Sequence, residues 1–325
     1  MLLLSRDDAI KLIEMPDCIK VVEKAFVELA SGTAVLPPRI NITPPEGLCL
    51  YMPAYLKEMG ALACKVVTVY KNNPTEHDIP TTIGKVLLQD PETGDVICIM
   101  DGGYLTAART GAVSGVATKY LAREDRGQKA GIFGVGVQAR AQLWAMTVVR
   151  DIVKAYVYDV VDEAVTKFIE EMSTKLSLEV VRANSPDHLL DEADIICTAT
   201  SSPTPIFDGN KVRKGTHINA IGSHTPNARE LDTAIIKRSK IIADSYQACL
   251  SEAGDIMIPI QEGAIDKSHM HAELGEIVIG KKPSRADDKE ITLFKSNGLA
   301  IQDAAVAKLV YDKAVRARIG TEIKL

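Results

Sequence analysis

The feature that most constrains the fold is a regular alternation of short apolar runs and helical stretches after residue 122. The apolar runs read KAGIFGVG, KAYVYD, LEVVRA, ADIICTATSS, THINAIGSH and SKIIADS. Short apolar runs separated by helical stretches are typical of parallel strands joined by crossover helices. The pattern therefore predicts a doubly wound parallel α/β sheet, which we assign to residues 120–300.

The first 119 residues follow a different pattern. Helices are expected after Ser5, which can cap the first one, and between Asp17 and Gly32. A proline-rich stretch, 36–47, excludes regular helix. Four strand-like runs and a long helix come next, at Leu48–Met52, Ala61–Tyr70, Gly84–Gln89, Asp95–Met100 and Tyr104–Leu121. Together with a returning C-terminal helix, they predict an α+β domain made of residues 1–119 and 301–325.

Charge and composition narrow the classes of function. Lys and Arg total 38 against 43 Asp and Glu, and only 5% of residues are aromatic. A nucleic-acid-binding protein usually carries a basic face and stacking aromatic residues, so no nucleic-acid partner is expected. No run reaches the roughly 18 apolar residues that span a bilayer, and the start lacks the pattern of a secretory signal. We therefore expect a cytoplasmic protein without a membrane partner.

The cysteines also favour a cytoplasmic protein. Six of them stand singly, without the paired spacing of a zinc site, at positions 18, 49, 64, 98, 197 and 249. Most lie among apolar residues, so buried free thiols are favoured over disulfides, consistent with a reducing compartment. No metal site is expected.

The sharpest motif begins at the first apolar run of the predicted sheet. Gly134, Gly136 and Ala139 form a GxGxxA core, with Val137 and Gln138 between them. A glycine at the turn allows a tight bend, the second lets the backbone approach a pyrophosphate, and a small third residue lets the helix pack closely. The helix N-terminus offers free amides to phosphates. The motif therefore predicts a Rossmann-type dinucleotide site.

Asp159 indicates which dinucleotide is bound. It lies 23 residues after Gly136, at the end of the next apolar run. A carboxylate there accepts hydrogen bonds from the ribose hydroxyls and would repel a 2′-phosphate, which predicts NAD rather than NADP. The alternative is a helix cap. Four more residues at strand ends are expected along the cofactor, Thr200, Ser201, Gly222 and Ser223.

Two basic residues in apolar surroundings are candidates for the chemistry. Lys65 lies within the run ALACKVVTVY, where burial would lower its pKa and make it an acid/base group near neutral pH. The alternative is an edge-strand lysine facing water. Arg109 lies in YLTAARTGAVSG and has the planar donors that suit a carboxylate, although a structural ion pair is equally consistent.

The chain as a whole resembles the ornithine cyclodeaminase/mu-crystallin family over nearly its full length. The resemblance rests on a series of segments in the family's order, which are LPPRI, YMPAY, CKVVTVYKNN, PTTIG, LTAARTGAVSG, GVGVQAR, GSHTPNAREL and LFKSNGLAIQD. It implies that Arg39, Lys65, Thr82 and Arg109 surround the substrate carboxylate and the reacting carbon, with Lys65 as the acid/base. It also implies that Ser296 lies near the nicotinamide, that residues 222–224 line the cofactor, and that the protein is a homodimer.

One departure bears on the substrate. Family members that cyclise ornithine carry an aspartate at the position of His224, and a histidine cannot neutralise a second ammonium group. Ring closure of ornithine is therefore placed in doubt, and a small uncharged side chain is favoured. We expect His224 to have a site role, with a loop histidine making one hydrogen bond as the alternative.

The resemblance to archaeal-type members implies NAD-dependent oxidation of a small amino acid, L-alanine, to the 2-oxo acid pyruvate and ammonia. Three alternatives stay open. They are ornithine cyclodeaminase, a reductase of cyclic ketimines, and a nucleotide-binding protein with little catalytic activity.

Overall fold

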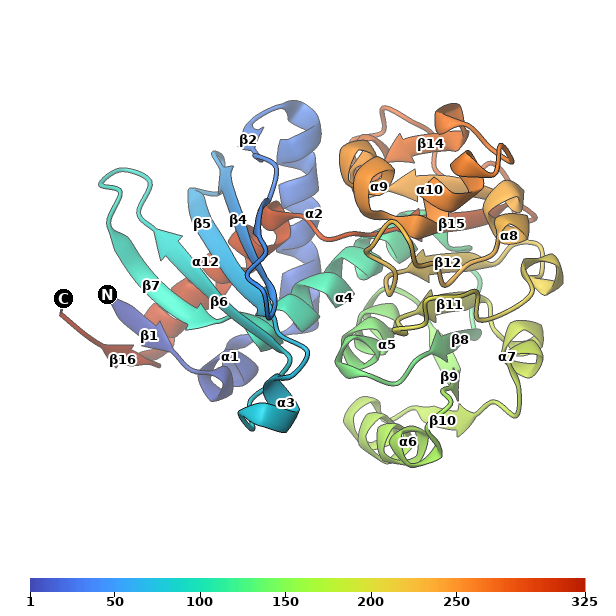
Figure 1. Ribbon diagram of the computed structural model, residues 1–325, viewed down its shortest axis with the longest axis horizontal. Helices are drawn as coiled ribbons and strands as arrows, with labels where there is room; N and C mark the ends of the chain where they lie inside the picture. Colours follow the sequence, from blue (N-terminus) through green and yellow to red (C-terminus); the bar gives the residue numbers. More distant parts are fainter. Residues whose placement is uncertain (325) are drawn as a thin grey trace. The chain divides into compact units, whose positions relative to one another are not determined.

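The computed structural model describes residues 1–324, so Leu325, the last residue of the predicted first domain, lies outside the described residues. The chain forms two compact units (Figure 1), one of Met1–Thr110 with Leu299–Leu325 and one of Gly111–Gly298. The sequence predicts the first boundary between the two domains at residues 119/120, whereas the structure divides the two units at residues 110/111. The difference arises because helix α4 (Gly102–Leu121) crosses this boundary.

The first unit is built on a mixed sheet in the order β16-β1-β7-β6-β5-β4-β2, with β3 paired to β4. Its strands are β1 (Leu2–Leu4), β2 (Ala34–Val35), β3 (Ile40–Ile42), β4 (Leu48–Leu56), β5 (Ala61–Val69), β6 (Thr82–Gln89), β7 (Val96–Asp101) and β16 (Thr321–Glu322). Among residues 1–324, β1 and β7 are the only neighbouring strands of this sheet that run parallel. Residues Leu2–Leu4, for which the sequence predicts no strand, thus form a strand of this sheet.

Helices cover one face of this sheet. They are α1 (Arg6–Leu12), α2 (Met15–Ser31) and α12 (Ala300–Ala317), with the short α3 (Asn73–Glu76) in a connection. Ser5 caps α1 in a reciprocal capping box with Asp8, as predicted. Helix α12 packs on β4, β5 and β6 (Figure 1). Met52, Ala54 and Leu56 alternate along β4 and are buried, because every second side chain of the strand faces the helices.

The second unit is an eight-stranded sheet in the order β10-β9-β8-β11-β12-β15-β13-β14, with every neighbouring pair parallel. Its strands are β8 (Gln128–Phe133), β9 (Ile152–Tyr158), β10 (Glu179–Arg182), β11 (Ile195–Thr198), β12 (His217–Ala220), β13 (Ser239–Ala243), β14 (Met270–Glu273) and β15 (Ile291–Lys295). The predicted doubly wound sheet is confirmed. The strand order reverses between β8 and β11, and ligands of such sheets bind beyond the carboxyl ends of the strands at this point.

Helices lie on both faces of this sheet. Their bounds are α5 (Val137–Val149), α6 (Asp162–Leu176), α7 (Pro186–Glu192), α8 (Thr233–Arg238), α9 (Tyr246–Glu252), α10 (Gly254–Gln261) and α11 (Leu274–Val278). One core joins α5 and α6 to the sheet through residues such as Leu143 and Phe168. A second core uses α7, α8 and α10 through residues such as Leu189 and Ile256. The sheet is therefore buried on both sides, which explains its continuous apolar runs.

Two further expectations can be compared with the described residues. All six cysteines are free, and Cys18, Cys98, Cys197 and Cys249 are buried, so the prediction of free thiols is confirmed. Between residues 1 and 324, no helix combines the length and the apolar character that a membrane crossing needs.

Candidate substrate and cofactor sites

Lys65 is buried in the first unit. Strand β5 lies between β4 and β6, and Lys65 pairs with Met52, so its side chain shares the face that α12 covers. The side chain is 2% exposed, and Nζ lies 2.8 Å from Oδ2 of Asp303. The alternative of an edge-strand lysine facing water is therefore wrong.

The surroundings of Lys65 lower its pKa to about 8. Burial makes the largest contribution, because it disfavours the charged amine, and the nearby positive charge of Arg109 acts in the same direction. The carboxylate of Asp303 opposes both, and the charge of Arg39 adds a smaller decrease. Lys65 can therefore exchange a proton near neutral pH, as an acid/base group must.

Asp303 joins two cations. Its Oδ1 accepts a hydrogen bond from Nε of Arg109 at 3.0 Å, while Oδ2 faces Lys65. Nη1 of Arg109 donates to Oε1 of Gln302 at 2.7 Å. The structural ion pair left open for Arg109 is thus present. Since two buried cations share one carboxylate, the cluster keeps a net positive charge, and a further anion would compensate for it.

Thr82 and Arg39 lie at the margin of this cluster. Thr82 begins β6 opposite Val69, on the same face as Lys65 but four residues further along the sheet, which corresponds to roughly 13 Å. It is exposed. Arg39 is half-buried in the connection before β3, close enough for its charge to act on Lys65. Thr82 therefore lies outside the cluster of Lys65, Asp303 and Arg109, further along the same face of the sheet.

Asp303 and Gln302 were missed by the sequence reasoning. The sequence contained a signal, because Asp303 and Gln302 are the only polar residues of the helical run LAIQDAAVA. A carboxylate on the buried face of a helix requires a cation. Pairing it with Lys65, which is 238 positions away, needed the tertiary structure.

The glycine motif of the second unit has the predicted form. Gly134 follows β8 with a φ of 84°, which favours glycine, and a Cβ there would lie 2.7 Å from the carbonyl oxygen of Ala199. Gly136 is the N-cap of α5, and a Cβ on it would meet no atom within 4 Å. The helix N-terminus is thus open to a phosphate group. Ala139 is fully buried, Gln138 is half-buried and Val137 is exposed.

Asp159 is tied to the glycine loop. Its Oδ2 accepts a hydrogen bond from the amide of Val135 at 3.0 Å, and its Oδ1 accepts one from Val161 at 3.1 Å. The N-cap of α6 is Val161, so the alternative in which Asp159 caps this helix is wrong. The carboxylate lies at the carboxyl end of β9, the strand next to β8.

A buried carboxylate holds the loops after β11 and β12. Glu230 accepts hydrogen bonds from the amide and hydroxyl of Thr200, at 2.6 and 2.7 Å, and from the amide of Gly222 at 2.8 Å. Gly222 is required here, because a Cβ would lie 2.4 Å from the carbonyl oxygen of Thr200. Burial raises the pKa of Glu230. The predicted positions Thr200 and Gly222 are thereby brought together, whereas Ser201 is exposed beside them.

Lys295 connects Glu230 to the next loop. Its Nζ lies 2.9 Å from Oδ2 of Asp255, with both side chains fully buried, and donates to the carbonyl oxygen of Ser223 at 2.5 Å. Asp255 in turn accepts from the amide of Glu230 at 2.8 Å. Burial acts to lower the pKa of Lys295, but the charges of Asp255 and Glu230 outweigh it and raise the pKa above its ordinary value. Lys295 is therefore a permanent cation.

Ser296 and His224 have protein partners of their own. The hydroxyl of Ser296 donates to Oδ2 of the buried Asp244 at 3.1 Å, which also accepts from the amide of Asn297 at 2.6 Å. His224 is exposed, and its Nδ1 donates to the carbonyl oxygen of Gly222 at 3.0 Å. His224 thus makes the single hydrogen bond expected of a loop histidine, which is the alternative to a role in the site. The buried residues Glu230, Asp244, Asp255 and Lys295 were all missed, because each has a partner that lies 30 or more positions away in the sequence.

A model of the ornithine cyclodeaminase/mu-crystallin family matches residues 1–318. The chain belongs to this family. It is similar to the Δ1-pyrroline-2-carboxylate reductase of Thermococcus litoralis, solved with NADH and L-proline, with 50% identity, 99% and 100% of the two chains covered and a TM-score of 0.95. An archaeal alanine dehydrogenase dimer with bound NAD is 36% identical, with 100% and 99% covered and a TM-score of 0.93. The Δ1-pyrroline-2-carboxylate reductase of Bacillus cereus is 38% identical over the full length of both chains.

As a member of the ornithine cyclodeaminase/mu-crystallin family, the protein is an NAD(P)-dependent oxidoreductase. The predictions of the family, of the Rossmann-type fold and of an enzyme are confirmed. The predicted cofactor, NAD, is confirmed by the solved relatives, which hold NADH or NAD.

Proposed function

We propose that the protein reduces Δ1-pyrroline-2-carboxylate, a cyclic ketimine, to L-proline. The observation that carries this proposal is the 50% identity with the Thermococcus litoralis reductase along almost the whole of both chains. The archaeal alanine dehydrogenase is 36% identical. Ketimine reduction, an open alternative of the sequence reasoning, therefore takes precedence over oxidation of alanine, which becomes the second candidate.

The reaction needs one proton and one hydride. The imine carbon gains the hydride, the electron pair of the C=N bond moves to nitrogen, and nitrogen takes a proton to become the secondary amine. Bound NADH supplies the hydride. Lys65 is suited to supply the proton, because a pKa of about 8 leaves it protonated at neutral pH while making it a better donor than an ordinary lysine.

The carboxylate of the substrate matches the unbalanced charge of the buried cluster. Nε and Nη1 of Arg109 are engaged by Asp303 and Gln302, while Nη2 has no hydrogen-bond partner among the described residues. A carboxylate accepting from Nη2, and attracted by Arg39, would bring the charge of the cluster close to neutral. The substrate would then be oriented beside Lys65, so that binding also positions the reacting atoms.

NAD fits the second unit through residues that the sequence already singled out. The open N-terminus of α5 suits the pyrophosphate, and Asp159 suits the ribose hydroxyls, which favours NADH over NADPH. Further contacts are assigned along the carboxyl edge of the sheet, to Gln138, Thr200, Ser201, Gly222, Ser223 and Ser296. We also assign His224 to this edge, because its ring donates a hydrogen bond to the carbonyl oxygen of Gly222.

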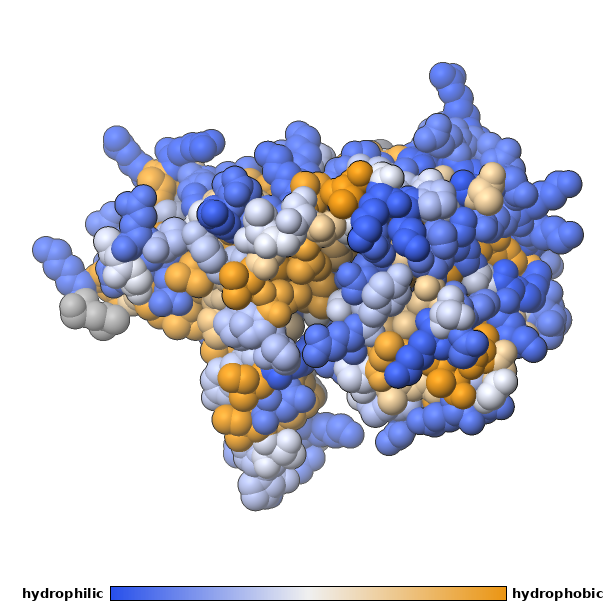
Figure 2. Space-filling model, turned by 90° about the horizontal axis from the view of Figure 1, so that it is seen from above, coloured by the Kyte–Doolittle hydropathy of each residue, from blue (hydrophilic) through white to orange (hydrophobic). Residues whose placement is uncertain are grey.

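We further propose that the protein forms a homodimer through its first unit. On the sheet face opposite α12, Tyr51, Pro53 and Tyr55 of β4 are half-buried. Val35, Ile40 and Ile42 at the neighbouring edge are each more than half exposed. Figure 2, which shows one face of the molecule, has hydrophobic patches among the hydrophilic residues. A second copy would cover such surface, and the archaeal relative is a dimer. The free cysteines fit a cytoplasmic location.

Oxidation of NADH with defined substrates tests the function. The purified protein is incubated with NADH and Δ1-pyrroline-2-carboxylate, and proline is identified as the product. Pyruvate with ammonia serves as the second arm. The proposal expects kcat/KM for the ketimine to exceed that for pyruvate by about tenfold or more. A higher value for pyruvate would instead establish an alanine dehydrogenase, and proline formed from ornithine with catalytic NAD would establish a cyclodeaminase.

A further inference from the structure

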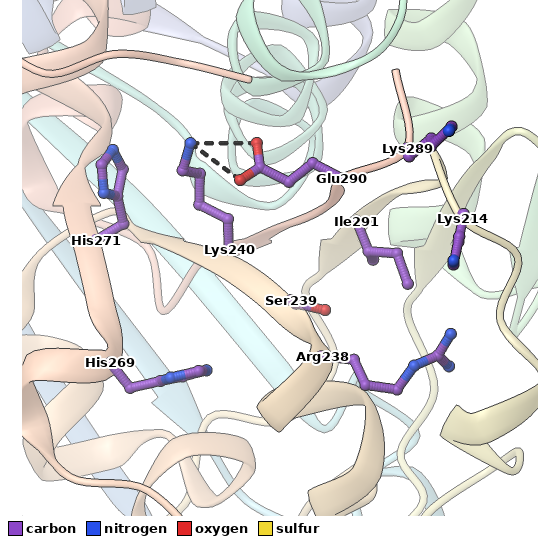
Figure 3. A pocket seen from close by; sticks show the side chains of 9 residues that line it. All are labelled: Lys214, Arg238, Ser239, Lys240, His269, His271, Lys289, Glu290 and Ile291. Atoms are coloured by element: carbon purple, nitrogen blue, oxygen red, sulfur yellow. Dashed lines mark hydrogen bonds and ion pairs between the residues drawn. The ribbon is translucent and has the colours of Figure 1, made fainter. Parts of the chain in front are cut away.

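A cavity of about 480 Å³ opens at the amino ends of three neighbouring strands of the second unit, β13, β14 and β15. It is shown in Figure 3. The lining residues are Lys214, Arg238, Ser239, Lys240, His269, His271, Lys289, Glu290 and Ile291. Since the dinucleotide motif lies at the carboxyl ends of parallel strands, this cavity is at the opposite edge of the sheet. The five residues of β15 correspond to roughly 16 Å between the two edges.

The lining carries an excess of positive charge. Lys214, Arg238, Lys240 and Lys289 face a single carboxylate, that of Glu290. Four cations in one cavity are unexpected in a chain whose net charge is −5. With neutral histidines, the formal charge of the lining is +4 − 1 = +3. A concentration of one sign of charge in a concave site attracts an oppositely charged ligand.

One pair in this cavity is already neutralised. Nζ of Lys240 lies 3.1 Å from Oε1 of Glu290, and Figure 3 marks this ion pair with dashed lines. The same Nζ donates to the carbonyl oxygen of Ser284 at 2.8 Å. The negative charge of Glu290 is therefore not available to balance the positive charges of the other cations. Asp287 and Asp288, which precede Lys289, do not line the cavity. Asp287 is nevertheless close to Lys289, because the backbone amides of Lys289 and Glu290 and the charge of Lys289 lower the pKa of this carboxyl.

The other three cations, Arg238, Lys214 and Lys289, form no ion pair with a carboxylate among residues 1–324. The guanidinium of Arg238 donates to the carbonyl oxygens of Gly209 and Val212, which fix its position but leave its charge uncompensated. The amide of Gly215 donates to the carbonyl oxygen of Lys289 at 3.0 Å, which brings the backbone beside Lys214 to that of Lys289. Within residues 1–324, neither lysine side chain forms an ion pair.

The two histidines are held by carbonyl groups. Nε2 of His269 lies 2.8 Å from the carbonyl oxygen of Ile236, and Nε2 of His271 lies 2.9 Å from that of Pro283. Because a carbonyl oxygen only accepts, Nε2 carries the hydrogen in both rings. Nδ1 of each ring is then the nitrogen without a hydrogen, which can accept a hydrogen bond.

We propose that this cavity binds a small phosphate-bearing polyanion, separately from the dinucleotide. A planar guanidinium and two lysines that form no ion pair among the described residues suit the oxygens of phosphate groups, and a formal charge of +3 for the lining suits a ligand with two or three negative charges. The volume is within the range of small-molecule sites. The proposal does not depend on which imine or amino acid the enzyme uses.

The test is isothermal titration of the full-length protein with inorganic pyrophosphate at constant ionic strength. Saturating NADH is present throughout, so that the pyrophosphate site at α5 is occupied. Saturable binding at one equivalent per chain is expected. Lys214→Gln and Arg238→Gln are each expected to weaken Kd about tenfold, the effect of losing one charge-assisted hydrogen bond. Lys214 is exposed, so its variant tests the site without endangering the fold.

The matched control is Lys154→Gln, which removes an exposed lysine paired with Glu179 on β10, outside the cavity. Its Kd is expected to remain unchanged. Equal weakening in the control and in Lys214→Gln would overturn the proposal, because it would show a general effect of net charge. Absence of saturable binding would also overturn it. Binding of citrate as tight as that of pyrophosphate would overturn the assignment to phosphate groups.

Discussion

Each unit of the protein buries a lysine against an aspartate, and the two pairs behave in opposite ways. Lys65 and Asp303 are 2.8 Å apart in the first unit, and Lys295 and Asp255 are 2.9 Å apart in the second. All four side chains are almost completely buried. Nevertheless, the pKa of Lys65 falls to about 8, whereas that of Lys295 rises above its ordinary value.

The difference lies in the neighbours of each pair. Around Lys65, two further cations, Arg109 and Arg39, add to the effect of burial. Around Lys295, a second carboxylate, Glu230, adds to Asp255 and outweighs burial. A buried lysine therefore becomes a proton donor where cations are in excess, and a fixed cation where carboxylates are in excess. We expect the first to act in catalysis and the second to hold the loops at the cofactor edge.

Replacing Lys65 should produce the largest effect. Lys65→Ala removes the group that delivers the proton, so kcat should fall by about 10²- to 10⁴-fold. NADH binding should be preserved, since the dinucleotide motif lies in the other unit. Steady-state rates with Δ1-pyrroline-2-carboxylate and fluorescence titration with NADH measure the two quantities. A rate near that of the wild type would contradict the role of Lys65.

Replacing Asp303 should alter the pH dependence. For the reductive reaction Lys65 must be protonated, so kcat/KM should fall as the pH rises through about 8. Asp303→Asn removes the carboxylate that raises the pKa of Lys65, so this decline should move to lower pH. It also leaves two buried cations unpaired, at a cost of about 3–5 kcal/mol in the free energy of unfolding. An unchanged pH profile in a folded variant would show that Asp303 does not act on Lys65.

Replacing Lys295 should affect stability and cofactor binding. Lys295→Met leaves Asp255 and Glu230 buried without a cation, so the free energy of unfolding should fall by about 3–5 kcal/mol. The KM for NADH should rise, because the carbonyl of Ser223 loses its donor. Denaturant unfolding and rates at varied NADH measure these effects. The pH at which kcat/KM declines should stay as in the wild type. A shift of that pH would mean that Lys295 takes part in proton transfer.

Replacing His224 should produce the smallest effect, because it belongs to neither cluster. Its side chain is exposed and makes one hydrogen bond, so His224→Ala should cost less than about 1 kcal/mol in stability. If His224 only orders its loop, kcat/KM should change by no more than about threefold. A larger loss with unchanged stability would support a direct role at the cofactor edge. The same assays used for Lys65→Ala provide the measurement.

The second unit was the more predictable part of the fold. Its apolar runs are continuous because the sheet is buried on both faces, and its glycine motif follows a strand and opens a helix. In the first unit, the helix boundaries followed from Ser5 and from the long Ala- and Thr-rich run. The strand formed by Leu2–Leu4 was not predicted, because three residues carry no periodicity and their partners, in β7 and β16, are distant in the chain.

The sequence by itself determined the fold class, the dinucleotide motif, the family and the candidate lysine, because each depends on local spacing or on the order of motifs. It did not determine that Asp303 would bridge Lys65 and Arg109, or that Glu230, Asp255 and Lys295 would share one network. Only the tertiary structure decided these contacts, since they join residues from separate strands and helices. The charge balance of a buried site, and therefore the pKa of its lysine, is set by which side chains meet in space.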